Sequence, residues 1–104
     1  MSEAGQTLMD QIRVCIPFTR LADSYLDLFL VHRIHPEIGL DAAALDGYSM
    51  SRISKIAEKL AGRGLAVSFH GPFWDLSPGS PDPAVRELTR RRFQQMLSWV
   101  PVFQ

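Results

Sequence analysis

Hydrophobic residues form two kinds of pattern along this chain, short continuous runs and longer stripes at helical spacing. The run IRVCIP at residues 12–17 is typical of a buried strand that a proline ends. The runs EIGL at residues 37–40 and LAVSFH at residues 65–70 have the same character and predict a second and a third strand. Residues 1–11 are polar and show neither pattern, so we predict a disordered N-terminal segment there.

A stripe of apolar residues at helical spacing follows each of these runs. The first helix is predicted over residues 21–33; Ser49 or Ser51 would cap the second, and Asp82 with Pro83 would begin the third. Residues 41–48 are predicted to be a turn-rich connection. The predicted buried faces are Leu21, Tyr25, Leu28 and Phe29 in the first helix, Met50, Ile53, Ala57, Leu60 and Ala61 in the second, and Val85, Leu88, Phe93, Met96, Leu97 and Val100 in the third.

The order of these elements is βαβαβα, which predicts an α/β fold with a parallel sheet and right-handed crossovers. The strands begin near residues 12, 36 and 65, and this spacing suits the roughly 31 residues that each unit of a (β/α)₈ barrel needs. We therefore predict that residues 12–104 are the first three units of a TIM barrel, an incomplete barrel. A small three-layer α/β sheet has the same local pattern, so spacing alone leaves both folds open.

Charge and cysteine content exclude several classes of partner and compartment. Eleven basic residues balance eleven acidic ones, so we predict neither a nucleic-acid nor a membrane partner, and we interpret the run Arg90–Arg92 as a solvated helix face. The N-terminus lacks the pattern of a signal peptide, and the single cysteine fits a reducing compartment, so a cytoplasmic location is predicted. That cysteine, Cys15, lies in an apolar strand and is interpreted as an inert core thiol.

Three segments resemble one known family. HGPFWDLSPGS at residues 70–80, EIGLDAAALD at 37–46 and DPAVRELTRRRFQQML at 82–97 resemble the xylose isomerase-like superfamily of sugar phosphate isomerases and epimerases. The resemblance implies a parent enzyme in which a divalent metal (Mn, Mg, Co or Zn) polarises a sugar carbonyl while a proton moves next to it. A metal-dependent phosphodiesterase resembling the AP endonucleases, and a non-catalytic half-barrel, are the alternatives.

The same resemblance implies functional residues at the carboxyl ends of the strands. His70, at the end of the third strand, would be a metal ligand. The residues that would bind the sugar or sugar phosphate are Glu37, Asp41, Phe73 and Trp74. Because His70 and Asp41 both follow parallel strands, we expect them to project from the same end of the sheet. Asp75 is predicted to organise the loop by accepting hydrogen bonds from the backbone amides of Ser77 and its neighbours. His32 and His35 are predicted to be structural.

The resemblance also places most of the active site outside this sequence. In that superfamily the metal-binding carboxylates come mainly from later strands, which would lie beyond Gln104. We therefore predict that the chain alone is inactive and binds metal weakly at best, since catalytic zinc takes three protein ligands. Three units leave two free strand edges and a third helix without a fourth strand, so its stripe, with Trp99 and Phe103, would lack partners and the chain would self-associate.

Overall fold

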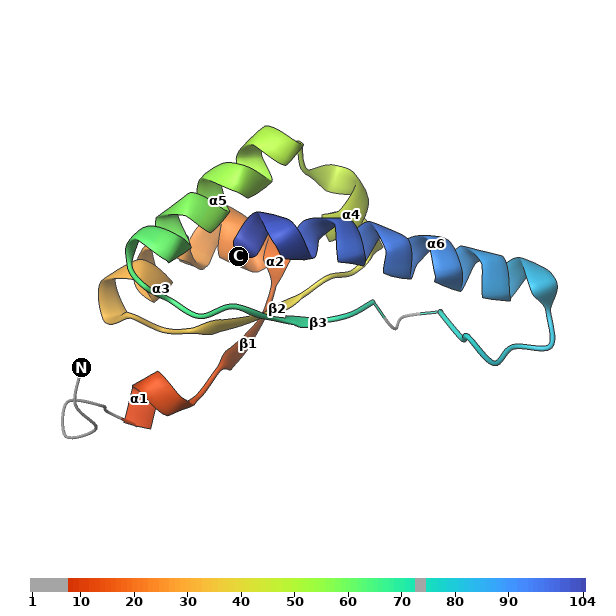
Figure 1. Cartoon of the computed structure of the whole chain (residues 1–104), viewed down its shortest axis with the longest axis horizontal. Coiled ribbons are helices and arrows are strands. Elements are labelled where there is room, and N and C mark those ends of the chain that lie inside the picture. Colours follow the sequence, from red (N-terminus) through yellow and green to blue (C-terminus); the bar gives the residue numbers. More distant parts are fainter. Residues whose placement is uncertain (1–7, 73–74) are drawn as a thin grey trace.

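The computed structural model describes residues 8–72 and 75–104, and Figure 1 shows the arrangement of their elements. The predicted strands and the three main helices are all present, and several of their ends are shifted. In chain order the elements are α1 (Leu8–Gln11), β1 (Val14–Pro17), α2 (Phe18–Arg20), the π-helical turn η2 (Leu21–Tyr25), α3 (Leu26–His32), β2 (Pro36–Gly39), α4 (Ala42–Gly47), α5 (Met50–Gly62), β3 (Ser68–His70), α6 (Pro83–Trp99) and the 3-10 turn η3 (Val100–Phe103).

The strands form one parallel sheet in the order β1-β2-β3. Val14 lies opposite Pro36 at the start of the sheet, and Gly39 lies opposite His70 at its end. The helices α2–α6 lie on the same side of this sheet, above it in Figure 1. The prediction of an α/β fold with a parallel sheet is therefore confirmed.

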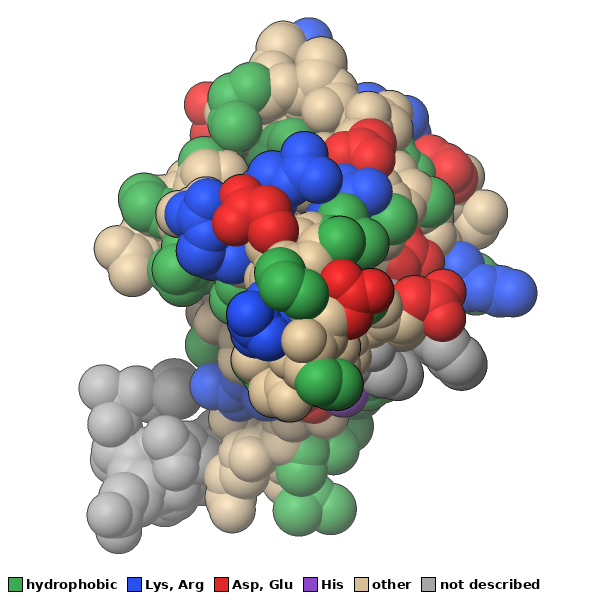
Figure 2. Space-filling view, turned by 90° about the vertical axis from the view of Figure 1, so that its right-hand side faces the viewer, with side chains coloured by type: hydrophobic (Ala, Val, Ile, Leu, Met, Phe, Trp, Pro, Cys, Tyr) green, Lys and Arg blue, Asp and Glu red, His purple; other side chains and the backbone are tan. Residues whose placement is uncertain are grey.

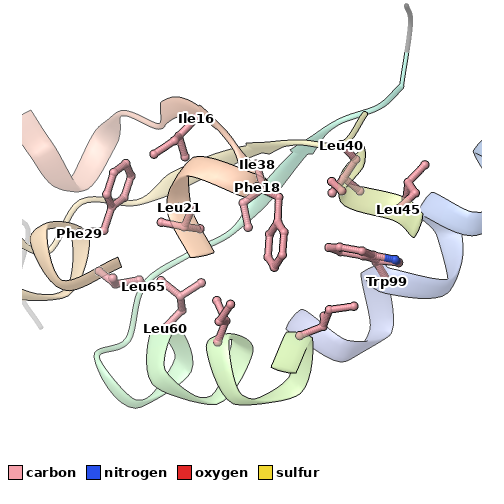
Figure 3. Close-up of a cluster of buried hydrophobic side chains, with 13 residues drawn as sticks. Ile16, Phe18, Leu21, Phe29, Ile38, Leu40, Leu45, Leu60, Leu65 and Trp99 are labelled. Atoms are coloured by element: carbon pink, nitrogen blue, oxygen red, sulfur yellow. The ribbon is translucent and has the colours of Figure 1, made fainter. Parts of the chain in front are cut away.

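The hydrophobic core lies between the sheet and these helices (Figure 3). Ile16 of β1 and Ile38 of β2 are buried on the helix-facing side of the sheet. Phe18 is completely buried, and the rings of Tyr48 and Trp99 pack edge-on against it with centroids 4.9 and 4.8 Å away. One core thus joins the first β/α unit to the last helix.

The first long helix contains a π-helical turn, which overturns part of its predicted face. A regular helix would place Tyr25 four residues after Leu21 on the buried side, yet Tyr25 is 41% exposed and Leu28 is 47% exposed. The π-helical turn spans Leu21–Tyr25 and contains one residue more than a regular turn, so the next residue on the buried face comes five positions after Leu21. Leu26 therefore takes the place predicted for Tyr25, and Phe29 stays buried as predicted.

The segment between β2 and α5 is a helix and not the turn-rich connection that the sequence predicts. Asp41 begins α4, because its side chain accepts a hydrogen bond from the Ala44 amide at 2.9 Å. Ser49 is the cap of α5, with its hydroxyl oxygen 3.2 Å from the Arg52 amide, which settles the choice between Ser49 and Ser51. The buried face of α5 is Ile53, Ile56, Ala57 and Leu60; Met50 and Ala61, which were predicted to be buried, are exposed.

The last helix begins as predicted, with Asp82 as its cap and Pro83 in its first turn. Its core contacts differ from the prediction, because Leu97 is 60% exposed whereas Trp99 is only 3% exposed. The turn η3 then brings Phe103 edge-on against Phe69 of β3 at 5.3 Å. The expected lack of partners for Trp99 and Phe103 is therefore wrong, since residues of β3 and α2 supply them.

Residues 8–11 belong to a short helix, α1, where the sequence predicts disorder. Asp10 places a carboxylate oxygen 3.6 Å from Nε2 of His35, which is 7% exposed. Nδ1 of the same ring accepts a hydrogen bond from the Ala66 amide at 2.8 Å, so His35 has the predicted structural role. Within the described residues, no helix has the length and apolar character that crossing a bilayer would require.

Candidate functional site

The face of the sheet that points away from α2–α6 carries the polar and reactive side chains. Successive strand residues point to opposite faces, so the burial of Ile16 and Ile38 puts their neighbours on this face. The register aligns these neighbours in two rows across the sheet: Cys15, Glu37 and Ser68 in the first, and Pro17, Gly39 and His70 in the second.

A pocket of about 250 Å³ lies at the carboxyl ends of the strands. Asp41 and His70 both line it, so the expectation that they project from the same end of the sheet is confirmed. This end is the place where barrels of parallel strands carry their functional groups. Among the described residues, its lining is Cys15, Pro17, Gly39, Leu40, Asp41, His70 and Gly71.

Glu37 and His70 meet beside this pocket across the central and third strands. The Oε1 atom of Glu37 lies 4.0 Å from Nδ1 of His70, and the two side chains are 38% and 48% exposed. An imidazole next to a carboxylate can hold a hydroxyl group between them or move a proton. This edge therefore offers one carboxylate and one imidazole that can form hydrogen bonds with a ligand.

Asp41 caps the helix α4 in addition to lining the pocket. Its Oδ1 atom accepts from the Ala44 amide and fixes the start of α4. The described contacts use Oδ1, which leaves Oδ2 for a ligand. Asparagine would keep the cap and remove the charge, because both residues are good helix caps.

The loop after β3 is attached to α6 through Thr89, and Thr89, not Asp75 as predicted, accepts a hydrogen bond from the Ser77 amide. The Ser77 amide donates to Oγ1 of Thr89 at 3.0 Å, and the Thr89 hydroxyl donates to the Val85 carbonyl at 2.8 Å. Asp75 instead occupies a left-handed backbone conformation, with φ of 59°. The predicted sugar-binding residues Phe73 and Trp74 lie outside the described residues.

A second pocket, of about 400 Å³, adjoins the first one through Asp41. Its lining is Asp41, Ala42, Ala43, Pro72, Asp75, Leu76 and Arg92. Sequence reasoning treated Arg92 as part of a solvated face, yet its Nη1 atom donates to Asp46 at 2.8 Å and to Gln95 at 2.9 Å. The hydrogen bond from Arg92, with a second one from Gln95, holds the pKa of Asp46 below its usual 3.8.

Cys15 is exposed and lines the first pocket, so its predicted place in the core is wrong. The strand is apolar, but only one of its faces packs against helices. Ile16 takes the packed face, and the alternation of the strand puts Cys15 on the other.

The residues that the structure describes do not form a metal site by themselves. Among them, no three His, Cys, Asp or Glu side chains are grouped closely enough to hold an ion. His70 and Glu37 supply two candidate ligands, whereas a catalytic zinc site takes three from the protein. A divalent metal bound here would need ligands from other residues.

No protein-family model and no curated protein matches this chain. A solved structure does resemble it: the TTHB071 protein from Thermus thermophilus, soaked with ZnCl₂, superposes with a TM-score of 0.66 and 32% sequence identity. The match covers 88% of this chain and 35% of the Thermus chain. This chain therefore has the fold of a segment of the Thermus protein and spans about a third of its length.

Proposed function

We propose that this chain forms the first three β/α units of a barrel of the xylose isomerase-like superfamily. The strands lie in sequence order and in parallel, and α2–α6 are on one side of them. A doubly wound sheet has helices on both faces, whereas consecutive units of a barrel have them on the outer face alone. This chain spans 35% of the length of the Thermus chain, which is close to the share that three of eight barrel units would take.

The proposed reaction of the parent barrel is isomerisation or epimerisation of a sugar or sugar phosphate. One observation carries this proposal: Asp41 and His70 line one pocket at the carboxyl end of the sheet, and Glu37 lies beside His70. Carboxylates and an imidazole in a small open pocket suit the hydroxyl groups of a sugar. In this proposal these side chains bind and orient the sugar.

The metal-ligand role of His70 remains a prediction. The described residues lack a set of three ligands, so we assign no step of the reaction to a metal. The ZnCl₂ soak of the Thermus protein is a reason to test zinc, together with manganese and cobalt. A cytoplasmic location and a small-molecule partner also remain predictions.

The alternative of a metal-dependent phosphodiesterase has less support. A nuclease on this barrel would need unpaired basic side chains beside the pocket to attract a phosphodiester. Arg92, the basic residue that lines the second pocket, is paired with Asp46, and Arg90 on the same helix is paired with Glu87. We therefore favour a sugar over a nucleic acid as the ligand of this end of the sheet.

The test is a titration of the full ¹⁵N-labelled chain with aldoses, ketoses and their phosphate esters, followed by NMR. We expect weak, saturable shifts of the Gly39, Leu40 and Gly71 amides, which belong to the first pocket. His70→Ala and Glu37→Gln should weaken the binding at least severalfold. His32→Ala, which changes a histidine that lines none of the three pockets, is the matched control. If neither a sugar nor a sugar phosphate shifts these amides up to its solubility limit, the proposal fails.

A further inference from the structure

The two pockets at the carboxyl end of the sheet adjoin each other at Asp41, and we call them together the groove. They share Asp41, and the adjacent residues Gly71 and Pro72 line the first and the second pocket respectively. The groove therefore runs from His70 over Asp41 to Arg92. A sugar that occupies the first pocket would extend a substituent into the second.

The second pocket is rich in negative charge. Asp41 and Asp75 both line it, and Arg92 is the one basic residue among the described residues of its lining. Asp46 compensates the charge of Arg92 through the 2.8 Å contact with Nη1. Figure 2 looks at this end of the molecule and shows Asp and Glu side chains interleaved with the Lys and Arg side chains. In the described lining of this pocket, two carboxylates therefore stand against one guanidinium group that Asp46 already pairs.

We infer that this groove selects an unphosphorylated, polyhydroxylated sugar over its phosphate ester. The inference rests on the proposed function, because it concerns the substrate class of the same site. Sugar hydroxyls can donate hydrogen bonds to the carboxylates of Asp41 and Asp75, whereas a phosphate group brings about two negative charges at neutral pH. A pocket that binds phosphate supplies backbone amides or cations that are not already neutralised.

Asp75→Asn is the variant that tests the charge of the second pocket. The left-handed backbone of Asp75 suits asparagine, so the loop conformation should be kept. Asp82→Asn is the matched control, because it removes the same charge and asparagine also caps a helix. Asp82 lines neither pocket of the groove.

The experiment compares an unphosphorylated ketose with its phosphate ester, each titrated into the full chain at low salt and followed by NMR. We expect the ester to bind on the order of tenfold more weakly, and added salt to reduce this ratio. Asp75→Asn should improve binding of the ester severalfold and leave the unphosphorylated sugar unchanged, whereas Asp82→Asn should change neither.

The outcomes separate this inference from the proposed function. If the ester binds as tightly as the unphosphorylated sugar, the inference is wrong and the sugar-binding proposal stands. Equal gains in Asp75→Asn and Asp82→Asn would show an effect of total charge and would also overturn the inference. If neither compound shifts the amides of the first pocket, the proposed function itself fails.

Discussion

The indole of Trp99 packs edge-on against the ring of Phe18, with their centroids 4.8 Å apart. Phe18 follows the first strand, and Trp99 ends the last long helix, so this contact joins two distant parts of the chain. Both side chains are almost fully buried. The pair therefore keeps α6 on the sheet, and α6 in turn holds the loop that borders the candidate site.

Trp99→Ala should reduce the free energy of unfolding by about 3–5 kcal/mol, because it leaves a large cavity in the core. Leu97→Ala removes another apolar side chain of the same helix, yet that side chain is 60% exposed, so its effect should stay within about 0.5 kcal/mol. Urea denaturation of the two variants measures the difference. Similar losses in both would show that α6 is not docked through Trp99.

Thr89 should control the loop after β3 through its hydroxyl group. Thr89→Val keeps the shape of the side chain and removes the acceptor of the Ser77 amide, at a cost of about 1–3 kcal/mol. Hydrogen exchange of the Ser77 amide should then become faster. Thr89→Ser, which retains the hydroxyl group, should keep this amide protected. Unchanged exchange in Thr89→Val would exclude the hydrogen bond as the anchor of the loop.

The ion pair between Asp46 and Arg92 predicts a pH dependence in the acid range. The pKa of Asp46 is lowered in the folded chain, mainly by the hydrogen bond from Arg92. A lowered folded pKa contributes stability above the unfolded value of 3.8, and this contribution is lost as the pH falls through the folded pKa. NMR titration should show the pKa of Asp46 returning toward 3.8 in Arg92→Met. A titration curve that does not move in this variant would contradict the assignment.

Local signals in the sequence predicted the elements that depend on neighbouring residues. Ser49 and Asp82 cap their helices because a side-chain oxygen reaches amides two or three residues ahead, which needs no tertiary contact. The places of Asp41 and His70 also followed from local order, since parallel strands end at one edge of the sheet. These parts of the site were therefore accessible from the sequence.

Features that depend on distant contacts were not predicted. The exposure of Cys15 follows from which face of the sheet the helices cover, and a short apolar strand does not show this. The π-helical turn moves Tyr25 out of the predicted stripe, and periodicity assumes a regular helix. Arg92 pairs with Asp46, which lies 46 residues away in the sequence. The sequence alone therefore offered no reason to distinguish Arg92 from the two arginines before it.

Metal binding by this chain should be weak. His70 and Glu37 are two candidate ligands 4.0 Å apart, and the described residues supply no group of three. Calorimetric titrations with Mn²⁺, Co²⁺ and Zn²⁺ should therefore show no tight one-to-one site, because a zinc site of high affinity needs more protein ligands. A tight site that disappears in His70→Ala would refute this prediction, and His32→Ala is the control for histidines elsewhere on the surface.

Self-association should occur through the edges of the sheet. In the part of the chain that the structure describes, β1 and β3 each pair with β2 alone, so each leaves one row of backbone groups without a strand partner. Near the β1 edge, Ile12 is 39% exposed and Val14 is 36% exposed, which adds apolar surface to the unpaired strand. We expect the sedimentation coefficient of the chain to rise with concentration.

Two lysine variants show whether the β1 edge is responsible. Ile12→Lys adds a charge beside this edge, as natural edge strands often do, and should weaken the association. Leu97→Lys changes an apolar residue that is more exposed but lies on α6, so it should leave the association unchanged. If both variants weaken the self-association equally, exposed apolar side chains in general, and not the β1 edge, cause it. The prediction is wrong if the chain sediments as a monomer at every concentration and melts cooperatively. The unpaired edges of β1 and β3 would then not drive association, because the aromatic packing of Phe18 with Trp99 and of Phe69 with Phe103 already stabilises the three units as a self-contained fold.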